Sequence, residues 1–107
     1  MKVVFICGPY RARTIHDVVQ NIRRAEAYAK KYWKLGYAVI CPHMNTALFD
    51  GLLPDEVWLS GMLEVLRRCD VVVLTLGWNK SEGSRVEADE ALKANKEIIT
   101  DDEILLF

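Results

Sequence analysis

The sequence has little of what stabilises secreted or membrane-embedded proteins. Its three cysteines, Cys7, Cys41 and Cys69, are odd in number and show no Cys-x-x-Cys spacing. Each lies beside an apolar run, which favours reduced core thiols over a disulfide framework. No apolar stretch approaches the roughly 20 residues of a membrane-spanning helix, and the apolar run 3–7 is too short for the core of a signal peptide. We therefore expect a cytoplasmic protein with no membrane partner.

An excess of charge of one sign is also missing. There are 14 Lys and Arg residues against 15 Asp and Glu, a formal net charge of -1 at pH 7. Proteins that coat nucleic acid or anionic membranes need a basic excess, so we expect neither as a bulk partner. The chain has 2 histidines, and a zinc site takes three or four ligands, so we expect no metal. We also expect no cofactor.

What is present is a regular alternation of two patterns. The 107 residues, 51% of them hydrophobic, suit one domain covering 1–107. Short apolar runs predict strands over 3–7, 37–41, 71–76 and 97–100. Helical spacing predicts helices from Thr14, its N-cap, to Gly36, over about 55–68, and over about 84–95. Residues 103–107 predict either a fifth edge strand or a packing surface for a partner.

This alternation predicts an α/β fold. Continuous apolar strands separated by helices call for a parallel sheet covered on both faces. We predict a three-layer doubly wound sheet of four or five strands in the order 2-1-3-4, with any fifth strand last. The chain then reverses between the first and third strands, where ligands bind beyond the strands' carboxyl ends. Residues 8–13 and 77–84 should lie there.

The second of these segments leads to a candidate nucleophile. Ser81, Gly83 and Ser84 offer hydroxyls, open backbone and a helix start, which suit a phosphate or another anion. Alternatively, Ser84 and Glu87 form a capping box that only begins the helix. At about 100° per residue, Glu87 is the one acid on the apolar side of this helix. A partly desolvated carboxylate beside an anion pocket is a candidate covalent nucleophile.

The first segment supports two chemistries. Tyr10 could orient Glu87, and Arg11 or Arg13 could pair with an anionic substrate, unless both arginines are simply solvated. Alternatively, Cys7 with Arg13 and Thr14 forms a Cys-x5-Arg-Thr pattern, similar to the phosphate loop of low-molecular-weight tyrosine phosphatases. That alternative makes Cys7 a nucleophile rather than a core thiol.

Further along the chain, His43, Asn45 and Asp50 could line the same crevice, or they could simply order the loop over 42–54.

Several motifs, in this order along the chain, resemble the nucleoside 2-deoxyribosyltransferase-like superfamily, which includes the 2′-deoxynucleoside 5′-phosphate N-hydrolases. The resemblance covers nearly the whole chain, and its motifs look most like short, poorly characterised bacterial and phage members. The motifs are residues 5–11, Cys41-Pro42-His43-x-Asn45-Thr46, residues 69–73, Gly77-Trp78-x-x-Ser81, and Ser81-x-Gly83-x-x-x-Glu87-x-x-x-Ala91.

The resemblance implies a flavodoxin-like (Rossmann-like) fold and cleavage or transfer at the N-glycosidic bond of a nucleoside or nucleoside 5′-monophosphate. It implies that Glu87 attacks C1′, that Tyr10 positions Glu87, and that two steps retain the sugar configuration. It also implies self-association as a homodimer or higher oligomer. A 5′-phosphate would be bound by Ser81, Gly83, Ser84 and one arginine of the first loop, Arg11 or Arg13, while Gly8 of the same loop is a further substrate-binding candidate.

One position departs from that superfamily. Its active members carry an aspartate that assists the leaving base where this chain has Met62. Protonation of the base would then fall to Asp50 or His43. The alternative is a catalytically silent nucleotide-binding module. Self-association through the apolar segment Ile104-Leu105-Leu106-Phe107 is expected in either case.

Overall fold

The protein is built on a four-stranded parallel sheet, described for residues 1–106 by a computed structural model. The strands are β1 (Val3–Cys7), β2 (Ala38–Ile40), β3 (Val71–Thr75) and β4 (Glu97–Asp101). Their order is β2-β1-β3-β4, with β1 parallel to both β2 and β3. The predicted α/β, flavodoxin-like sheet and its order are therefore confirmed.

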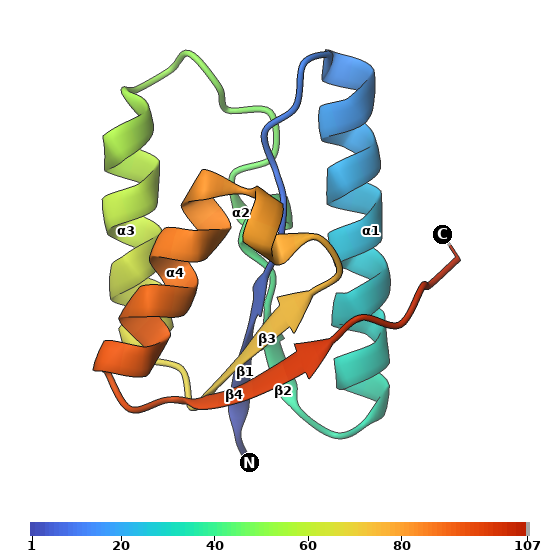
Figure 1. The fold of residues 1–107 in the computed structure, drawn as a ribbon, viewed down its shortest axis with the longest axis vertical. Coiled ribbons are helices and arrows are strands. Elements are labelled where there is room, and N and C mark those ends of the chain that lie inside the picture. The colour runs from blue at the N-terminus through green and yellow to red at the C-terminus, as the bar shows by residue number, and fades with distance from the viewer. Residues whose placement is uncertain (107) are drawn as a thin grey trace.

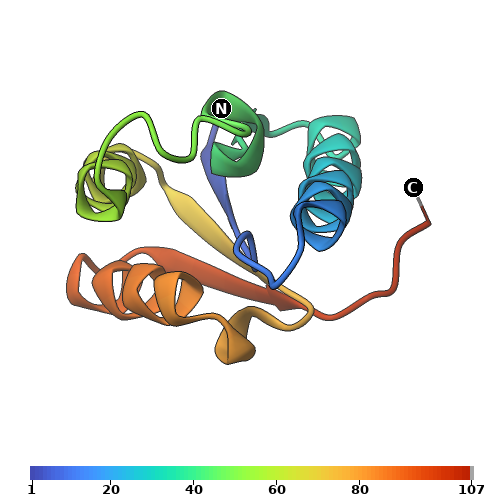
Figure 2. The same ribbon diagram turned by 90° about the horizontal axis from the view of Figure 1, so that it is seen from above.

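Helices cover both faces of the sheet, as Figures 1 and 2 show. Helix α1 (Ile15–Lys34) lies on one side, and α3 (Asp55–Arg67) and α4 (Glu82–Lys93) lie together on the other. Two short elements complete the chain: α2 (Pro42–Asn45), which follows β2, and the 3-10 turn η1 (Trp78–Lys80), which follows β3.

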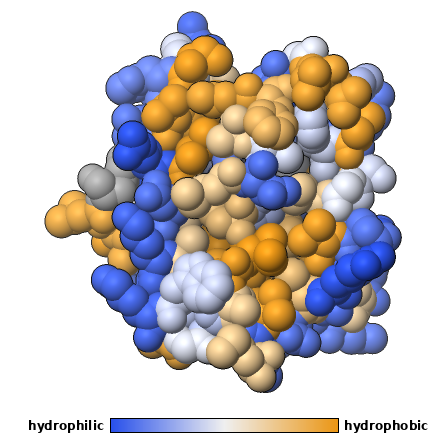
Figure 3. Space-filling view, turned by 180° about the vertical axis from the view of Figure 1, so that it is seen from behind, coloured by the Kyte–Doolittle hydropathy of each residue, from blue (hydrophilic) through white to orange (hydrophobic). Residues whose placement is uncertain are grey.

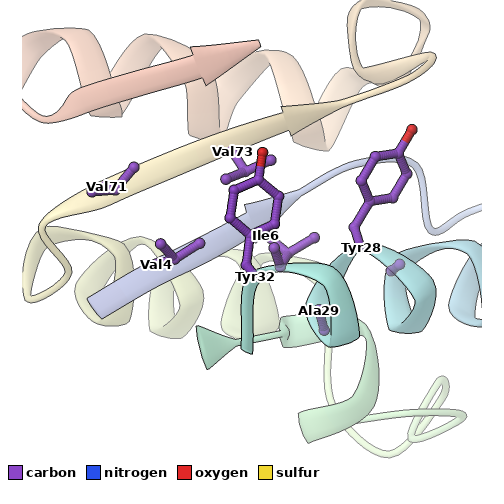
Figure 4. Packing of buried hydrophobic residues seen from close by; sticks show 8 residues of the cluster. Val4, Ile6, Tyr28, Ala29, Tyr32, Val71 and Val73 are labelled. Carbon is purple, nitrogen blue, oxygen red and sulfur yellow. The ribbon is translucent and has the colours of Figure 1, made fainter. Parts of the chain in front are cut away.

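The core is divided between the two faces because side chains alternate along each strand. Val4 and Ile6 of β1 pack with Tyr28 and Tyr32 of α1, as Figure 4 shows. Phe5 and Cys7 point the other way, toward a second cluster that includes residues of α3 and α4. Burial on both faces explains why β1 and β3 are uninterrupted apolar runs rather than alternating ones.

Helices α1 and α4 each begin after a residue whose side chain caps them. Thr14 accepts a hydrogen bond from the Asp17 amide at 3.1 Å, which confirms the predicted N-cap of α1. The start predicted for α4 is wrong by two residues. Ser81 is its N-cap and accepts from the Ser84 amide at 3.3 Å, so Ser84 and Glu87 form no capping box. Ser84 is 2% exposed, within the first turn, where it cannot act as the flanking cap residue.

Other sequence predictions need correction. The predicted loop over 42–54 contains α2, whose first residue is Pro42. Ile15 and Trp33 share the helical spacing of the buried Val18 and Ala29, yet they are 70% and 56% exposed at the two ends of α1. Residues 102–106 form no strand in the described chain, and the prediction for Phe107 lies outside the described residues. Within residues 1–106, no helix combines the length and apolar character needed to span a membrane.

Candidate functional site

A cavity of about 600 Å³ opens beyond the carboxyl ends of the sheet strands, between the first turn of α4, helix α3 and the loops that follow β1 and α2. This is the position that the doubly wound topology predicts for a ligand. The predicted site residues line this cavity, except Arg13, Asn45 and the alternative nucleophile Cys7. Those in the lining are Gly8, Tyr10, Arg11, His43, Asp50, Ser81, Gly83, Ser84 and Glu87. Arg13 is exposed and lies outside the lining.

Glu87 is the central acid of the cavity. Helix α4 carries it on the side facing the end of β1, beside the Cys7 thiol. Burial raises the pKa of Glu87 to about 7, and the neighbouring thiol opposes this rise only partly. A carboxyl group with this pKa is present in both protonation states at neutral pH.

Cys7 itself is a poor nucleophile. Its side chain is fully buried, and its sulfur lies 3.4 Å from the Ser84 carbonyl oxygen, which accepts from the thiol. Burial, reinforced by the neighbouring Glu87 charge, raises the pKa of Cys7 far above its usual value. A phosphatase needs an accessible thiolate with a lowered pKa. The structure therefore argues against the predicted phosphatase alternative.

Tyr10 contacts a different acid from the one expected. Its hydroxyl donates to Asp50 Oδ1 at 2.7 Å and accepts from the Leu48 amide at 3.0 Å. The Tyr10 hydrogen bond is the main reason that the pKa of Asp50 lies below its usual value. Although Tyr10 and Glu87 line the same cavity, the expected hydrogen bond between them is not formed. Tyr10 instead holds the loop between α2 and α3 over the site.

The Arg11 guanidinium group forms ion pairs with two carboxylates. One guanidinium nitrogen lies 3.0 Å from Asp50 Oδ2, and another lies 2.6 Å from Asp55 Oδ1. With its charge balanced by two carboxylates, Arg11 offers less free charge to a phosphate, and its phosphate contact stays a prediction. Sequence reasoning could not find these pairs, because they join residues 39 and 44 positions apart.

His43 forms hydrogen bonds with the backbone of the first loop, residues 8–13. Its Nε2 lies 2.9 Å from the Gly8 carbonyl oxygen and 3.0 Å from that of Pro9. Because carbonyl oxygens only accept, Nε2 carries the proton and Nδ1 presents a lone pair. Burial lowers the pKa of His43, which keeps the ring neutral at pH 7. His43 also lines the cavity. It therefore combines the two alternatives given for it, because it lines the crevice and also holds a loop in place.

Gly8 permits the close approach of the first loop to β3. A Cβ built at this position would lie 2.1 Å from the Thr75 Oγ1 atom. No larger residue fits unless Thr75 moves, so the glycine is a steric requirement of the cavity floor.

Three buried polar atoms have no hydrogen-bond partner within the described residues: His43 Nδ1, Trp58 Nε1 and Ser84 Oγ. All three residues line the cavity. Because buried polar groups are normally paired, this concentration indicates ligand contacts. The sequence identified Ser84 and His43, but Trp58 carried only the signal of an apolar helix face.

The wall opposite α4 is aromatic and apolar. Phe49 and Trp58 contact each other with ring centroids 6.0 Å apart, and Leu59 and Met62 continue the same wall. Lys80, in η1, also lines the cavity and was missed because it has no motif of its own. Among residues 1–106, no cluster of histidine, cysteine and acidic side chains is arranged to hold a metal ion.

This geometry suits a flat ring against the aromatic wall and a polar, hydroxyl-bearing group near Ser84 and Glu87. Comparison with known structures is consistent at the level of the fold. A 2-deoxyribosyltransferase from the psychrotolerant bacterium Bacillus psychrosaccharolyticus superposes with a TM-score of 0.66 and 17% sequence identity. The match covers 97% of this chain and 77% of that one, and at this identity it shows the fold alone.

Sequence comparison adds the family. No curated protein matches the chain. A family model, described as a domain of unknown function, DUF7768, matches residues 2–101. Every strand and helix described above lies inside that match. The chain therefore belongs to the DUF7768 family.

Proposed function

We propose that this protein cleaves or transfers at the N-glycosidic bond of a nucleoside or nucleoside 5′-monophosphate, with Glu87 as the nucleophile. The observation that carries the proposal is the Glu87 carboxylate, partly buried in a 600 Å³ cavity with its pKa raised to about 7. A structural carboxylate on a helix gains nothing from such a position, whereas a nucleophile gains reactivity from desolvation.

The chemistry follows from the two walls of the cavity. The base stacks on the Phe49 and Trp58 rings, while the sugar lies beside Ser84 and Glu87. The ionised carboxylate attacks C1′ as the bond to the base nitrogen breaks, which gives a glycosyl-enzyme ester. Water or a second base then attacks C1′ and releases Glu87. The fold shared with a 2-deoxyribosyltransferase supports this class of reaction.

A second candidate is a nucleotide-binding protein without turnover. Met62 lies on the cavity wall where the superfamily resemblance leads us to expect an aspartate that assists the leaving base. If no other group replaces that acid, the cavity binds a nucleotide and releases no product. This candidate differs from the first in a single observable, the release of free base.

The test is an incubation with a panel of nucleosides, 2′-deoxynucleosides and their 5′-monophosphates, with free base and free phosphate measured separately. We expect base release, and a fall of about 1,000-fold or more in Glu87→Gln. Asp89→Asn is the matched control because Asp89 lies on the same helix but outside the cavity. Binding without base release would favour the second candidate. Full base release by Glu87→Ala would remove the central assignment.

A further inference from the structure

The charge on the cavity lining is mostly negative. Carboxylates at Asp50, Asp55, Glu56, Glu82 and Glu87 share the lining with two cations, Arg11 and Lys80. Arg11 is already paired with two of these acids, at 3.0 and 2.6 Å. Such a field raises the local concentration of cations and disfavours anions.

The cavity also offers little acid to protonate a departing base. Phe49, Leu59 and Met62 on the base wall carry no acidic proton. The Tyr10 hydroxyl donates to Asp50, whose lowered pKa keeps it ionised, and the neutral His43 uses its one N–H on the Gly8 and Pro9 carbonyls. Of the two cations in the lining, Arg11 is paired with carboxylates and Lys80 is an exposed side chain. A neutral purine or pyrimidine leaves poorly without such a proton.

One class of substrate suits both the negative charge of the lining and the lack of an acid for the leaving base. Building on the proposed function, we propose that the preferred substrate is an N-glycoside whose leaving base already carries a positive charge, of the pyridinium or N-alkylpurinium class. When the C1′–N bond breaks, its electron pair cancels the charge on the ring, and the base leaves neutral without a proton. Glu87 forms the new bond to C1′. Water then replaces Glu87, so hydrolysis yields base, sugar and one released proton.

The walls are suited to recognise such a base. The Phe49 and Trp58 faces attract a cationic ring, and the carboxylates around the mouth complement its charge. The Trp58 indole N–H, buried without a partner, can donate to a carbonyl or carboxamide oxygen on the ring. The unpaired Ser84 and His43 atoms, on side chains 2% and 5% exposed, remain for the hydroxyls of the sugar.

Binding tests the charge preference without any turnover. The probes are 1-methylnicotinamide, a pyridinium cation, and 6-methylnicotinamide, a neutral ring of nearly the same size, titrated into the intact protein by calorimetry. We expect tighter binding of the cation, by about tenfold. Glu82→Gln should weaken binding of the cation about threefold and leave binding of the neutral probe unchanged. Asp89→Asn, on the outer face of α4, should change neither affinity. Equal or tighter binding of the neutral probe would overturn the proposal.

Turnover separates this proposal from the general one. N-ribosyl nicotinamide is compared with adenosine and uridine, and both free base and proton release are recorded. We expect the pyridinium nucleoside to react at least tenfold faster, with one proton per base released and loss of both in Glu87→Gln. Faster reaction of the neutral nucleosides would preserve the proposed function and overturn the charge preference. Selective cation binding with no product from any substrate would preserve the preference and overturn the function.

Discussion

At the scale of single residues, the ionised Glu87 side chain destabilises the folded protein. Its pKa is raised from 4.5 to about 7 by burial, so the folded protein retains a proton that the unfolded chain has lost. Stability contributed by the protonated form is therefore lost as pH rises between these two values. A carboxylate that opposes folding at neutral pH is typical of a functional site.

Replacing Glu87 by glutamine should remove this cost. We expect Glu87→Gln to be more stable than the natural protein by about 2 kcal/mol near pH 8, and to gain nothing near pH 4. Thermal unfolding at the two pH values, followed by circular dichroism, measures the difference. Asp89→Asn, an exposed change on the same helix, should be neutral at both. A gain independent of pH would show that the Glu87 charge has no such role.

Gly8 offers a second test at this scale. Because a Cβ there would lie 2.1 Å from Thr75 Oγ1, Gly8→Ala should lower the free energy of unfolding by about 2–4 kcal/mol. Thr75→Ala removes the clashing oxygen, so the double variant should lose less than the sum of the single losses. Urea unfolding of the four proteins gives this coupling energy. Strictly additive losses of unfolding free energy would mean that the side chains at positions 8 and 75 do not contact each other.

At the scale of elements, the sequence predicted the strands and helices that depend on residues close together along the chain. Strands β1 and β3 were predictable because buried parallel strands read as unbroken apolar runs, and α1 was predictable from its threonine cap. Contacts between distant segments were not. The bonds from Arg11 and Tyr10 to Asp50 decide which acids face the cavity, yet no local pattern marks them.

The end of β4 is held to α1 by a compact polar cluster. Asp101, 8% exposed, accepts from the Lys31 ammonium at 2.6 Å and from the Tyr32 hydroxyl at 2.7 Å. Burial disfavours the Asp101 charge, but these two hydrogen bonds outweigh it and lower the pKa of Asp101. Stability from this cluster is present above the unfolded pKa of 3.8 and is lost as pH falls through the lower folded value.

Asp101→Asn should therefore destabilise the protein by about 1–3 kcal/mol at neutral pH, because Lys31 loses its buried partner. The penalty should shrink on acidification, as the natural protein loses the same interaction. Chemical denaturation at neutral and acidic pH measures both effects. Asp102→Asn, at the exposed neighbouring position, is the matched control. Equal losses in the two variants would locate the effect outside the Lys31 cluster.

At the scale of the whole molecule, apolar surface remains uncovered. Figure 3 shows it running through the middle of the face behind that of Figure 1, between hydrophilic margins. A second apolar surface is the C-terminal segment, which extends past α1 in Figure 1. Ile104 and Leu106 in this segment are 79% and 96% exposed. Exposed apolar groups that lie together are candidate contacts for another surface.

We propose that two copies of the chain associate through this segment. The Glu103 carbonyl accepts from the Tyr28 hydroxyl, and its carboxylate lies 2.6 Å from Lys31, so residues 104–106 leave α1 from a fixed point. Fixing the base of an apolar segment lowers the entropy lost when it docks. Light scattering at micromolar concentration should show a dimer or larger assembly. Leu106→Glu should shift it toward monomer, whereas Leu92→Glu, 65% exposed on α4, should not. A natural protein that is monomeric and fully active would remove the need for a partner copy.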